Sequence, residues 1–241
     1  MMFGMSETIG QMELRWNEYA FVRQGTLMFL TGVPLSGKSM IARLLSSLIE
    51  DCFLQQMDIL RLVAQDAESQ KPENERNPFV NYGSCDSYLA IGDGTYSPES
   101  LIAGFNAYSE VVSSYLDKII PKLEVQNAQN MLFEGVQLTP SVVYRYLNNN
   151  NRLVIVTSDA LTLSTNRTKV FGDSAHLTDR YSTEKLLHLQ EEIIRQSREI
   201  PEGKLTYVSN TGKYETTVRQ IIRYLFDSHI IERKSLHIPA A

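Results

Sequence analysis

The feature that most constrains this chain is a short run that joins an apolar stretch to an amphipathic one. Residues 32–39 read GVPLSGKS and match the pattern GxxxxGK[ST] at every fixed position. Thr26–Leu30 precedes the run and predicts a strand, and Lys38–Glu50 predicts a helix that opens at the end of the run. In such a loop, successive backbone amides point inward at phosphate oxygens, and the helix N-terminus adds partial positive charge. The run therefore predicts a loop that binds the phosphates of a nucleotide.

Each fixed position of the loop has a chemical role. Gly32 and Gly37 permit backbone shapes and close approaches that a side chain would block. Lys38 is expected to reach the β- and γ-phosphates, and the hydroxyl of Ser39 to bind Mg²⁺. The expected ligands are thus ATP and Mg²⁺. The residues expected to contact the nucleotide here are Gly32, Val33, Pro34, Leu35, Ser36, Gly37, Lys38, Ser39 and Met40.

Short apolar runs alternate with helical patterns along the whole chain. This alternation is typical of a parallel sheet that is covered on both faces, and it predicts an α/β fold with three layers. We expect a single domain over residues 1–241. The expected strands are Thr26–Leu30, Cys52–Met57, Met131–Phe133, Leu153–Val156 and Leu205–Val208, and the expected helices are Lys38–Glu50, Pro98–Ile120 and Thr216–Phe226.

Composition narrows the class of partner. Hydrophobic residues make up 43% and charged residues 21% of the chain, and the net charge is −5, so a nucleic acid or an anionic membrane is not an expected partner. The apolar runs are too short to span a bilayer, and the protein is expected to be cytoplasmic. Cys52 and Cys85 form no metal-binding pattern and are expected to be reduced thiols. The oligomeric state stays open, a homodimer being one option.

Two long segments do not fit simple crossovers between strands. Residues 65–110 contain a polar stretch rich in Pro, Asn and Gly, and we interpret them as an acceptor-binding segment. Residues 158–182 hold Arg167, Lys169 and Arg180, and we interpret them as a lid that brings cations to a transferring phosphoryl group. The alternative is an ordinary solvated loop with surface charges.

Two carboxylates follow expected strands. Glu134 comes directly after Met131–Phe133, where it could support a magnesium ion, although a solvent-facing strand end is the alternative. Asp58 follows the second strand, where it could accept the proton of an attacking hydroxyl, and Arg61 lies one turn later, where it could bind an anionic acceptor. For this pair the alternative is a helix-capping Asp with a solvated Arg.

Several stretches together resemble the kinase portion of 2-phosphoglycerate kinases, within the nucleoside-monophosphate-kinase-like group. The likeness spans about Thr26 to Phe226. Two departures from the family pattern are Met57 in place of Thr and Gln137 in place of His, and the acceptor segment has mostly its own sequence. The stretches that carry the resemblance are the phosphate-binding loop, Met57-Asp58-Ile59-Leu60-Arg61, Ser87-Tyr88-Leu89-Ala90, Leu101-Ile102-Ala103-Gly104-Phe105, Phe133-Glu134-Gly135-Val136-Gln137-Leu138-Thr139-Pro140, Asp179-Arg180-Tyr181 and Ser209-Asn210-Thr211-Gly212.

The resemblance implies five parallel strands in the order 2-3-1-4-5, with ATP and Mg²⁺ as ligands and a small hydroxyl or phosphate compound as the acceptor. It implies that Ser87, Tyr88 and Gln137 join the acceptor pocket. It also implies that Asn210 and Gly212 form a loop beside the adenine.

We expect a kinase in which Lys38, Asp58, Arg167 and Arg180 are catalytic. In that scheme Ser39 and Glu134 hold the metal, and the acceptor meets Asp58, Arg61, Ser87, Tyr88, Glu134 and Gln137. Two other classes of function stay open, a nucleoside, nucleotide or RNA-end kinase and a non-catalytic ATP-dependent interaction module. The second is disfavoured because such a module does not need an acid on the acceptor side.

Overall fold

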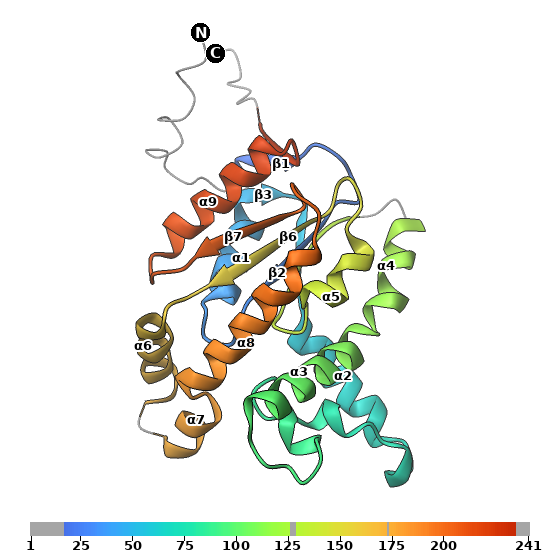
Figure 1. The fold of residues 1–241 in the computed structure, drawn as a ribbon. Coiled ribbons are helices and arrows are strands. Elements are labelled where there is room, and N and C mark those ends of the chain that lie inside the picture. The colour runs from blue at the N-terminus through green and yellow to red at the C-terminus, as the bar shows by residue number, and fades with distance from the viewer. Residues whose placement is uncertain (1–16, 126–128, 173, 235–241) are drawn as a thin grey trace, which may run out of the picture.

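The computed structural model describes residues 17–125, 129–172 and 174–234, and the rest of the expected domain 1–241 lies outside these ranges (Figure 1). The strands are β1 Tyr19–Phe21, β2 Leu27–Thr31, β3 Ile49–Glu50, β4 Cys52–Gln56, β5 Asn130–Glu134, β6 Arg152–Thr157, β7 Leu205–Ser209 and β8 Ile231–Arg233. The α-helices are α1 Lys38–Leu48, α2 Met57–Ser69, α3 Pro98–Ser113, α4 Leu116–Val125, α5 Pro140–Val143, α6 Ala160–Phe171, α7 Ala175–Arg180, α8 Thr183–Gln196 and α9 Tyr214–Asp227. The short 3-10 turns are Glu73–Glu75, Pro78–Asn81, Ser87–Ala90, Tyr144–Tyr146 and Ser197–Glu199.

The main sheet has five parallel strands in the order β4-β5-β2-β6-β7. Counted along the chain among these five strands, the order is 2-3-1-4-5, as expected. The strand that leads into the phosphate-binding loop therefore lies at the centre, between β5 and β6. This arrangement brings the carboxyl ends of β2, β4 and β5 to one edge of the sheet, where the candidate site lies.

The central strand β2 shows how the sequence builds two cores. All five of its residues are buried. Leu27 and Phe29 belong to the core on one face of the sheet, whereas Met28 and Leu30 belong to the core on the other face. Because successive side chains of a strand point to opposite faces, a strand buried on both faces is apolar throughout.

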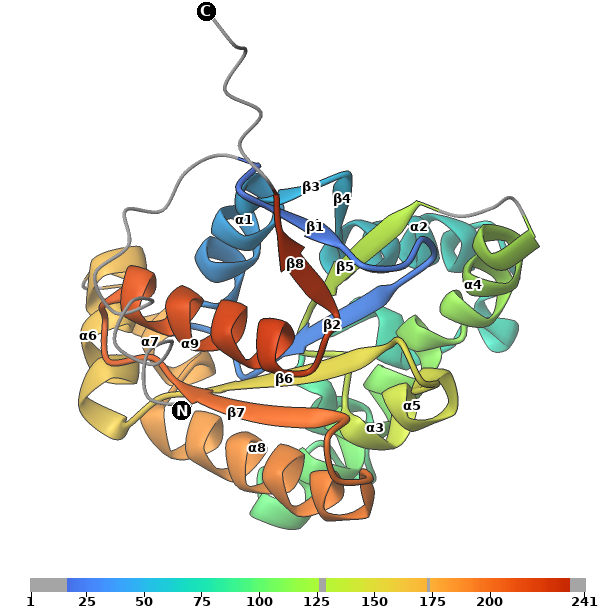
Figure 2. The ribbon, with the colours of Figure 1, turned by 90° about the horizontal axis from the view of Figure 1, so that it is seen from above.

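The helices form the two outer layers. Apolar residues of α1 and α9 fill one core, and those of α3, α4, α5 and α8 fill the other. Figure 2 shows α1 and α9 on one side of the sheet and α3 and α8 on the other. The expected α/β fold with three layers is therefore confirmed. None of the helices in the described part of the chain is long and apolar enough to cross a bilayer.

Three features differ from the sequence prediction. A second, three-stranded sheet, β3-β1-β8, packs beside α1 and α9. The single helix expected over Pro98–Ile120 is two helices, because α3 ends at Ser113 and α4 begins at Leu116. The segment expected as a lid is mostly helical and consists of α6 and α7.

Both cysteines are free as expected, and burial raises the pKa of each thiol to about 12.

The backbone of the acceptor segment packs closely against helix α3 at one glycine. Gly104 lies on the buried face of α3, and a Cβ there would come within 2.4 Å of the carbonyl carbon of Ser87. Any larger residue would push the turn Ser87–Ala90 off the helix. The sequence of α3 thus determines where the acceptor segment lies.

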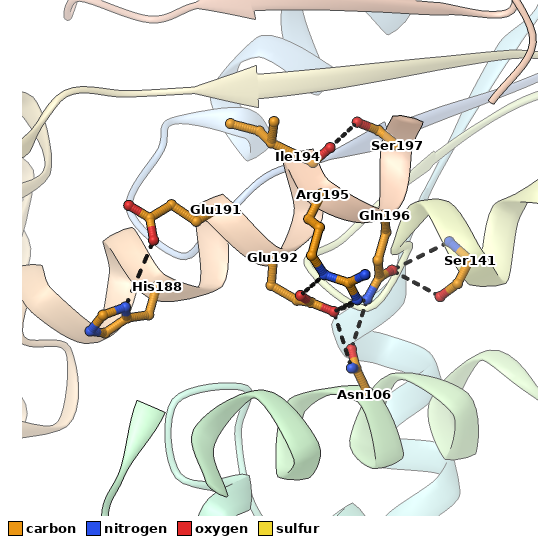
Figure 3. Close-up of polar contacts among 9 residues, drawn as sticks. All are labelled: Asn106, Ser141, His188, Glu191, Glu192, Ile194, Arg195, Gln196 and Ser197. Carbon is orange, nitrogen blue, oxygen red and sulfur yellow. Dashed lines mark hydrogen bonds and ion pairs between the residues drawn. The ribbon is translucent and has the colours of Figure 1, made fainter. Parts of the chain in front are cut away.

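A buried polar network anchors α8, the helix that follows the lid (Figure 3). The carboxylate of Glu192 is 4% exposed and accepts hydrogen bonds from Arg195, Gln196 and Asn106 of α3. The Gln196 amide also donates to Asn106 Oδ1 at 2.9 Å and accepts from the Ser141 hydroxyl at 2.9 Å. The C-terminal half of α8 is therefore tied to both α3 and α5.

Candidate active site

The phosphate-binding loop joins β2 to α1, as the pattern predicts. Gly37 precedes the helix with φ 84°, a left-handed conformation that favours glycine, and a Cβ there would lie 2.4 Å from Nδ2 of Asn210. Leu35 is also left-handed, with φ 66°, which is strained for a residue with a side chain. A strained loop of this kind needs support from its surroundings.

Side chains from beyond β6 and β7 provide that support. Asn210 Nδ2 donates to the carbonyl oxygen of Ser36 at 2.7 Å, and the Ser158 hydroxyl lies 3.4 Å from the same oxygen. Asn166 Nδ2, on α6, donates to the carbonyl oxygen of Leu35 at 2.9 Å. The loop is thus held in shape by three side chains distant in sequence.

Asn210 and Gly212 were expected beside the adenine, and the contact between Asn210 and Ser36 shows where they lie. Asn210 is fully buried, with Nδ2 bound to Ser36 and Oδ1 accepting from the backbone N–H of Gly212 at 3.0 Å. Because both ends of its amide are engaged by the protein, Asn210 supports the loop in this structure. Gly212 is exposed at φ 86°.

The carboxylate of Glu134 lies against the start of α1. Its Oε1 accepts from the Ser39 hydroxyl at 3.1 Å and lies 3.8 Å from Nζ of Lys38, which in turn is 3.4 Å from the carbonyl oxygen of Val33. Glu134 is only 4% exposed, so the alternative of a solvent-facing strand end is wrong. The hydroxyl of Ser36, within the loop, is buried and has no hydrogen-bond partner among the described residues.

These residues fit a nucleotide phosphate with Mg²⁺. An orphaned hydroxyl inside a loop of this shape is a group that a phosphate oxygen would satisfy. Ser39 and Glu134 offer the hard oxygen ligands that Mg²⁺ prefers, and Mg²⁺ usually takes its other ligands from water and phosphate. The described residues contain no cluster of three or more His, Cys, Asp or Glu that could hold a metal ion by themselves.

A cavity of about 370 Å³ opens beside the loop. Lys38 lines it from the start of α1, and Asp58 and Arg61 line it from α2. Arg180 lines it from the end of α7. Four of the residues expected from the sequence to act on a phosphoryl group and its acceptor thus meet around one space.

Asp58 lies in the first turn of α2, just beyond the carboxyl end of β4. The N-cap of this helix is Gln56, so the alternative of a capping role for Asp58 is wrong. Its Oδ1 accepts a hydrogen bond from Gln137 Nε2 at 3.1 Å. Arg61, one turn further along α2, is half-buried in the cavity wall rather than freely solvated.

Arg180 forms an ion pair with Asp86 of the acceptor segment. Burial raises the pKa of Asp86 above its ordinary value, although the charges of Arg180 and Lys185 oppose the shift. The contact joins the end of the lid segment to the acceptor segment.

Five residues that were expected to act on the acceptor or the phosphoryl group do not line the cavity, namely Ser87, Tyr88, Glu134, Gln137 and Arg167. Ser87 is fully buried and its hydroxyl donates to the carbonyl oxygen of Ser84 at 3.2 Å. Tyr88 packs edge-on against Tyr96, and the ammonium of Lys185 lies 4.9 Å from its ring centre. Neither residue lines the cavity, because the turn that carries them is pressed against Gly104 of α3. Arg167 is half-buried on α6 and is also outside the cavity lining.

The cavity wall includes residues that the sequence did not single out. Asn81 and Ser84 contribute from the acceptor segment, Tyr108 from α3, and Tyr181 from the residue after Arg180. Tyr108 stands one turn after Phe105, on the same buried face of α3, and so has the pattern of an ordinary core residue. Gln137, expected to meet the acceptor, is fully buried behind this wall and contacts Asp58 and Tyr108.

Fold and site together define a three-layer α/β protein with a phosphate-binding loop at the carboxyl end of its central strand. No protein-family model matches the chain, and no curated protein matches it. The resemblance to 2-phosphoglycerate kinases therefore stays a prediction.

Solved structures with a similar arrangement include three kinases, each 14% identical to this chain. The shikimate kinase from Acinetobacter baumannii matches over 86% of this chain and 94% of its own, with a TM-score of 0.49. The gluconokinase from Sinorhizobium meliloti 1021 matches over 85% and 94%, with a TM-score of 0.46. The thymidylate kinase from Candida albicans matches over 88% and 96%, with a TM-score of 0.45. At such low identities and scores, the activity has to be inferred from this chain's own residues.

Proposed function

We propose that this protein is an ATP- and Mg²⁺-dependent kinase that transfers the γ-phosphoryl group to a small, anionic, hydroxyl-bearing metabolite. The observation that carries the proposal is the single cavity lined by Lys38 of the phosphate-binding loop and by Asp58, Arg61 and Arg180. A loop alone requires only a nucleotide. An acid and two further cations facing it supply what a second, anionic substrate needs.

On the donor side, the loop amides and Lys38 bind the β- and γ-phosphates of ATP. Ser39 and Glu134 would hold Mg²⁺, which when bound neutralises charge on those phosphates. Because Glu134 and Lys38 are almost fully buried, their charges act in a medium that screens them little. They are also already oriented, so little reorganisation is needed when ATP binds.

On the acceptor side, Asp58 orients the acceptor hydroxyl and takes its proton. The acceptor oxygen then forms a bond to the γ-phosphorus while the bond from that phosphorus to the bridging β–γ oxygen breaks, leaving ADP. Arg61 binds the anionic group of the acceptor, and Arg180 offsets charge on the phosphoryl group in transit. Arg167, on α6, is proposed to approach when the lid closes.

The finer proposal is an acceptor like 2-phosphoglycerate. Of the three cations on the cavity wall, Lys38 lies beside Glu134 and Arg180 is paired with Asp86, whereas Arg61 forms no ion pair with any of the described residues. An unpaired guanidinium in the wall favours an acceptor that carries an anionic group. The motifs shared with 2-phosphoglycerate kinases point in the same direction.

The proposal is tested by ADP release in the presence of ATP, Mg²⁺ and a panel of acceptors. The panel contains hydroxy acids, phosphorylated metabolites, sugars and nucleosides, so that the nucleoside-kinase alternative is tested in the same assay. We expect release that depends on an anionic hydroxy compound and that is abolished in Lys38→Ala, with thermal unfolding as the check on folding. ATP turnover that no acceptor stimulates would argue for a nucleotide-dependent interaction module, and full activity in Lys38→Ala would remove the donor-site assignment.

A further inference from the structure

One buried amide joins two groups of the cavity wall. Gln137 is fully buried, and its Nε2 lies 3.1 Å from Asp58 Oδ1 and 2.6 Å from the hydroxyl oxygen of Tyr108. Asp58 and Tyr108 both line the cavity, whereas Gln137 does not. The amide therefore lies behind the wall and holds two of its members at a fixed separation.

The chemistry of Asp58 fixes which way the amide faces. A carboxylate only accepts hydrogen bonds, so the nitrogen of the Gln137 amide, and not its oxygen, must face it. The same nitrogen is then the one beside Tyr108, and an amide nitrogen only donates. Both hydrogens of the amide are thereby used, one on Asp58 and one on Tyr108.

This leaves the hydroxyl proton of Tyr108 without a partner. The oxygen of that hydroxyl accepts from Gln137, so its own proton points away from the amide. Among the residues that the structure describes, no other hydrogen bond is made by this hydroxyl. Burial raises the pKa of Tyr108 above its ordinary value, although the hydrogen bond from Gln137 opposes the shift, so the group keeps its proton at neutral pH. A buried donor with no partner at the wall of a cavity is a group that a ligand would satisfy.

We infer that Tyr108 donates its hydroxyl proton to an oxygen of the phosphoryl acceptor, and that Gln137 is a positioning residue that sets Tyr108 and Asp58 at a matched spacing. The inference rests on the proposed kinase function and adds a specificity determinant to it. Because one nitrogen holds both oxygens, an acceptor that places its reacting hydroxyl at Asp58 can meet Tyr108 with a second oxygen. The favoured acceptors are thus compounds that carry, besides the reacting hydroxyl, a second oxygen able to accept a hydrogen bond, such as that of a carboxylate or a phosphate ester.

Steady-state kinetics of the full chain tests this inference with glycerate and 2-phosphoglycerate as acceptor probes. Tyr108→Phe removes only the donated proton, and we expect kcat/KM for the acceptor to fall by about tenfold, the size of one hydrogen bond. The KM for ATP should not change. Tyr144→Phe is the matched control, because this tyrosine is 53% exposed and lies outside the cavity wall.

A second pair of variants tests the positioning role. Gln137→Glu keeps the shape but cannot donate to Asp58, so kcat should fall by more than tenfold. Gln137→His restores a donor and should recover a measurable part of kcat. A residue that only fills space would show no such order between Glu and His once both variants melt at the wild-type temperature.

The outcomes separate the inference from the function beneath it. No ADP release by the wild type with either probe would overturn the proposed acceptor class, and the inference with it. Release by the wild type together with unchanged kinetics in Tyr108→Phe would overturn the role of Tyr108 alone. Equal kcat in Gln137→Glu and Gln137→His would overturn the role of Gln137 as a hydrogen-bonding positioner.

Discussion

The anchor of α8 makes a quantitative prediction through Glu192. Replacing Glu192 with Gln keeps the size of the side chain but removes the charge that three neighbours bind (Figure 3). Hydrogen bonds to a charged group are worth about 1.5–3 kcal/mol each, and the bond to Arg195 is discounted because the Arg195 side chain is 64% exposed. The new amide oxygen can still accept one bond, so we expect a loss of about 1–3 kcal/mol in the free energy of unfolding.

Urea unfolding followed by circular dichroism measures this loss. The midpoint should fall without a change in the slope m, and the melting temperature should fall by about 2–4 °C per kcal/mol. Glu191→Gln is the matched control, because the side chain of Glu191 is 78% exposed and, among the described residues, pairs only with His188, at 3.9 Å. The control should stay within about 0.5 kcal/mol of the wild type.

The pH dependence of the same pair gives a second readout. Burial alone would raise the pKa of Glu192, but hydrogen bonds from Arg195, Gln196 and Asn106 outweigh it and hold the pKa below its ordinary value. A carboxylate with a lowered pKa in the folded state stabilises the fold above its unfolded pKa, about 4.3, and loses that contribution as the pH falls through the folded pKa. The difference between wild type and Glu192→Gln should therefore be full at pH 7 and shrink below about pH 4.3. If Glu192→Gln were as stable as the wild type at pH 7, the claim that Glu192 anchors α8 would be refuted.

Three further changes test other parts of the structure. Asn210→Ala removes the bond to the Ser36 carbonyl and should weaken ATP binding about tenfold by calorimetry, whereas an unchanged Kd would remove Asn210 as a support of the loop. Gly104→Ala places a methyl group against Ser87 and should destabilise the fold by about 1–3 kcal/mol in urea, and a variant of wild-type stability would show that the turn can move freely. Arg180→Ala should lower kcat by about a hundredfold with an unchanged Kd for ATP, and a kcat within a factor of about two would exclude Arg180 from the transfer step.

Much of the fold could be predicted because its signals are local. The pattern of residues 32–39 and the apolar run before it identify β2, the loop and α1 without reference to the rest of the chain. The strand order came from the resemblance rather than from periodicity. The three-stranded sheet could not be predicted, because β1 and β8 are short and pair Tyr19 with Arg233 across almost the whole chain.

The candidate site was predictable where a residue follows a strand, and less so elsewhere. Asp58 and Glu134 lie at carboxyl ends of parallel strands, and Lys38 opens the helix that the loop joins to the central strand, so all three lie at one edge of the sheet. Tyr88 was expected at the acceptor but does not line the cavity, because its position depends on how closely the acceptor segment packs on α3. Tyr108 carries no local signal, since its role depends on the partner that its hydroxyl meets in the fold.

The central claim is that one cavity brings the γ-phosphate of ATP to a small anionic acceptor. The most direct measurement is transfer of label from γ-³²P-ATP to 2-phosphoglycerate and to glycerate, with the labelled product separated from ATP and phosphate. We expect labelled product with the wild type, none with Lys38→Ala, and little with Asp58→Asn, which cannot take the hydroxyl proton. Label that appears only in inorganic phosphate, at the same rate with and without acceptor, would contradict the claim.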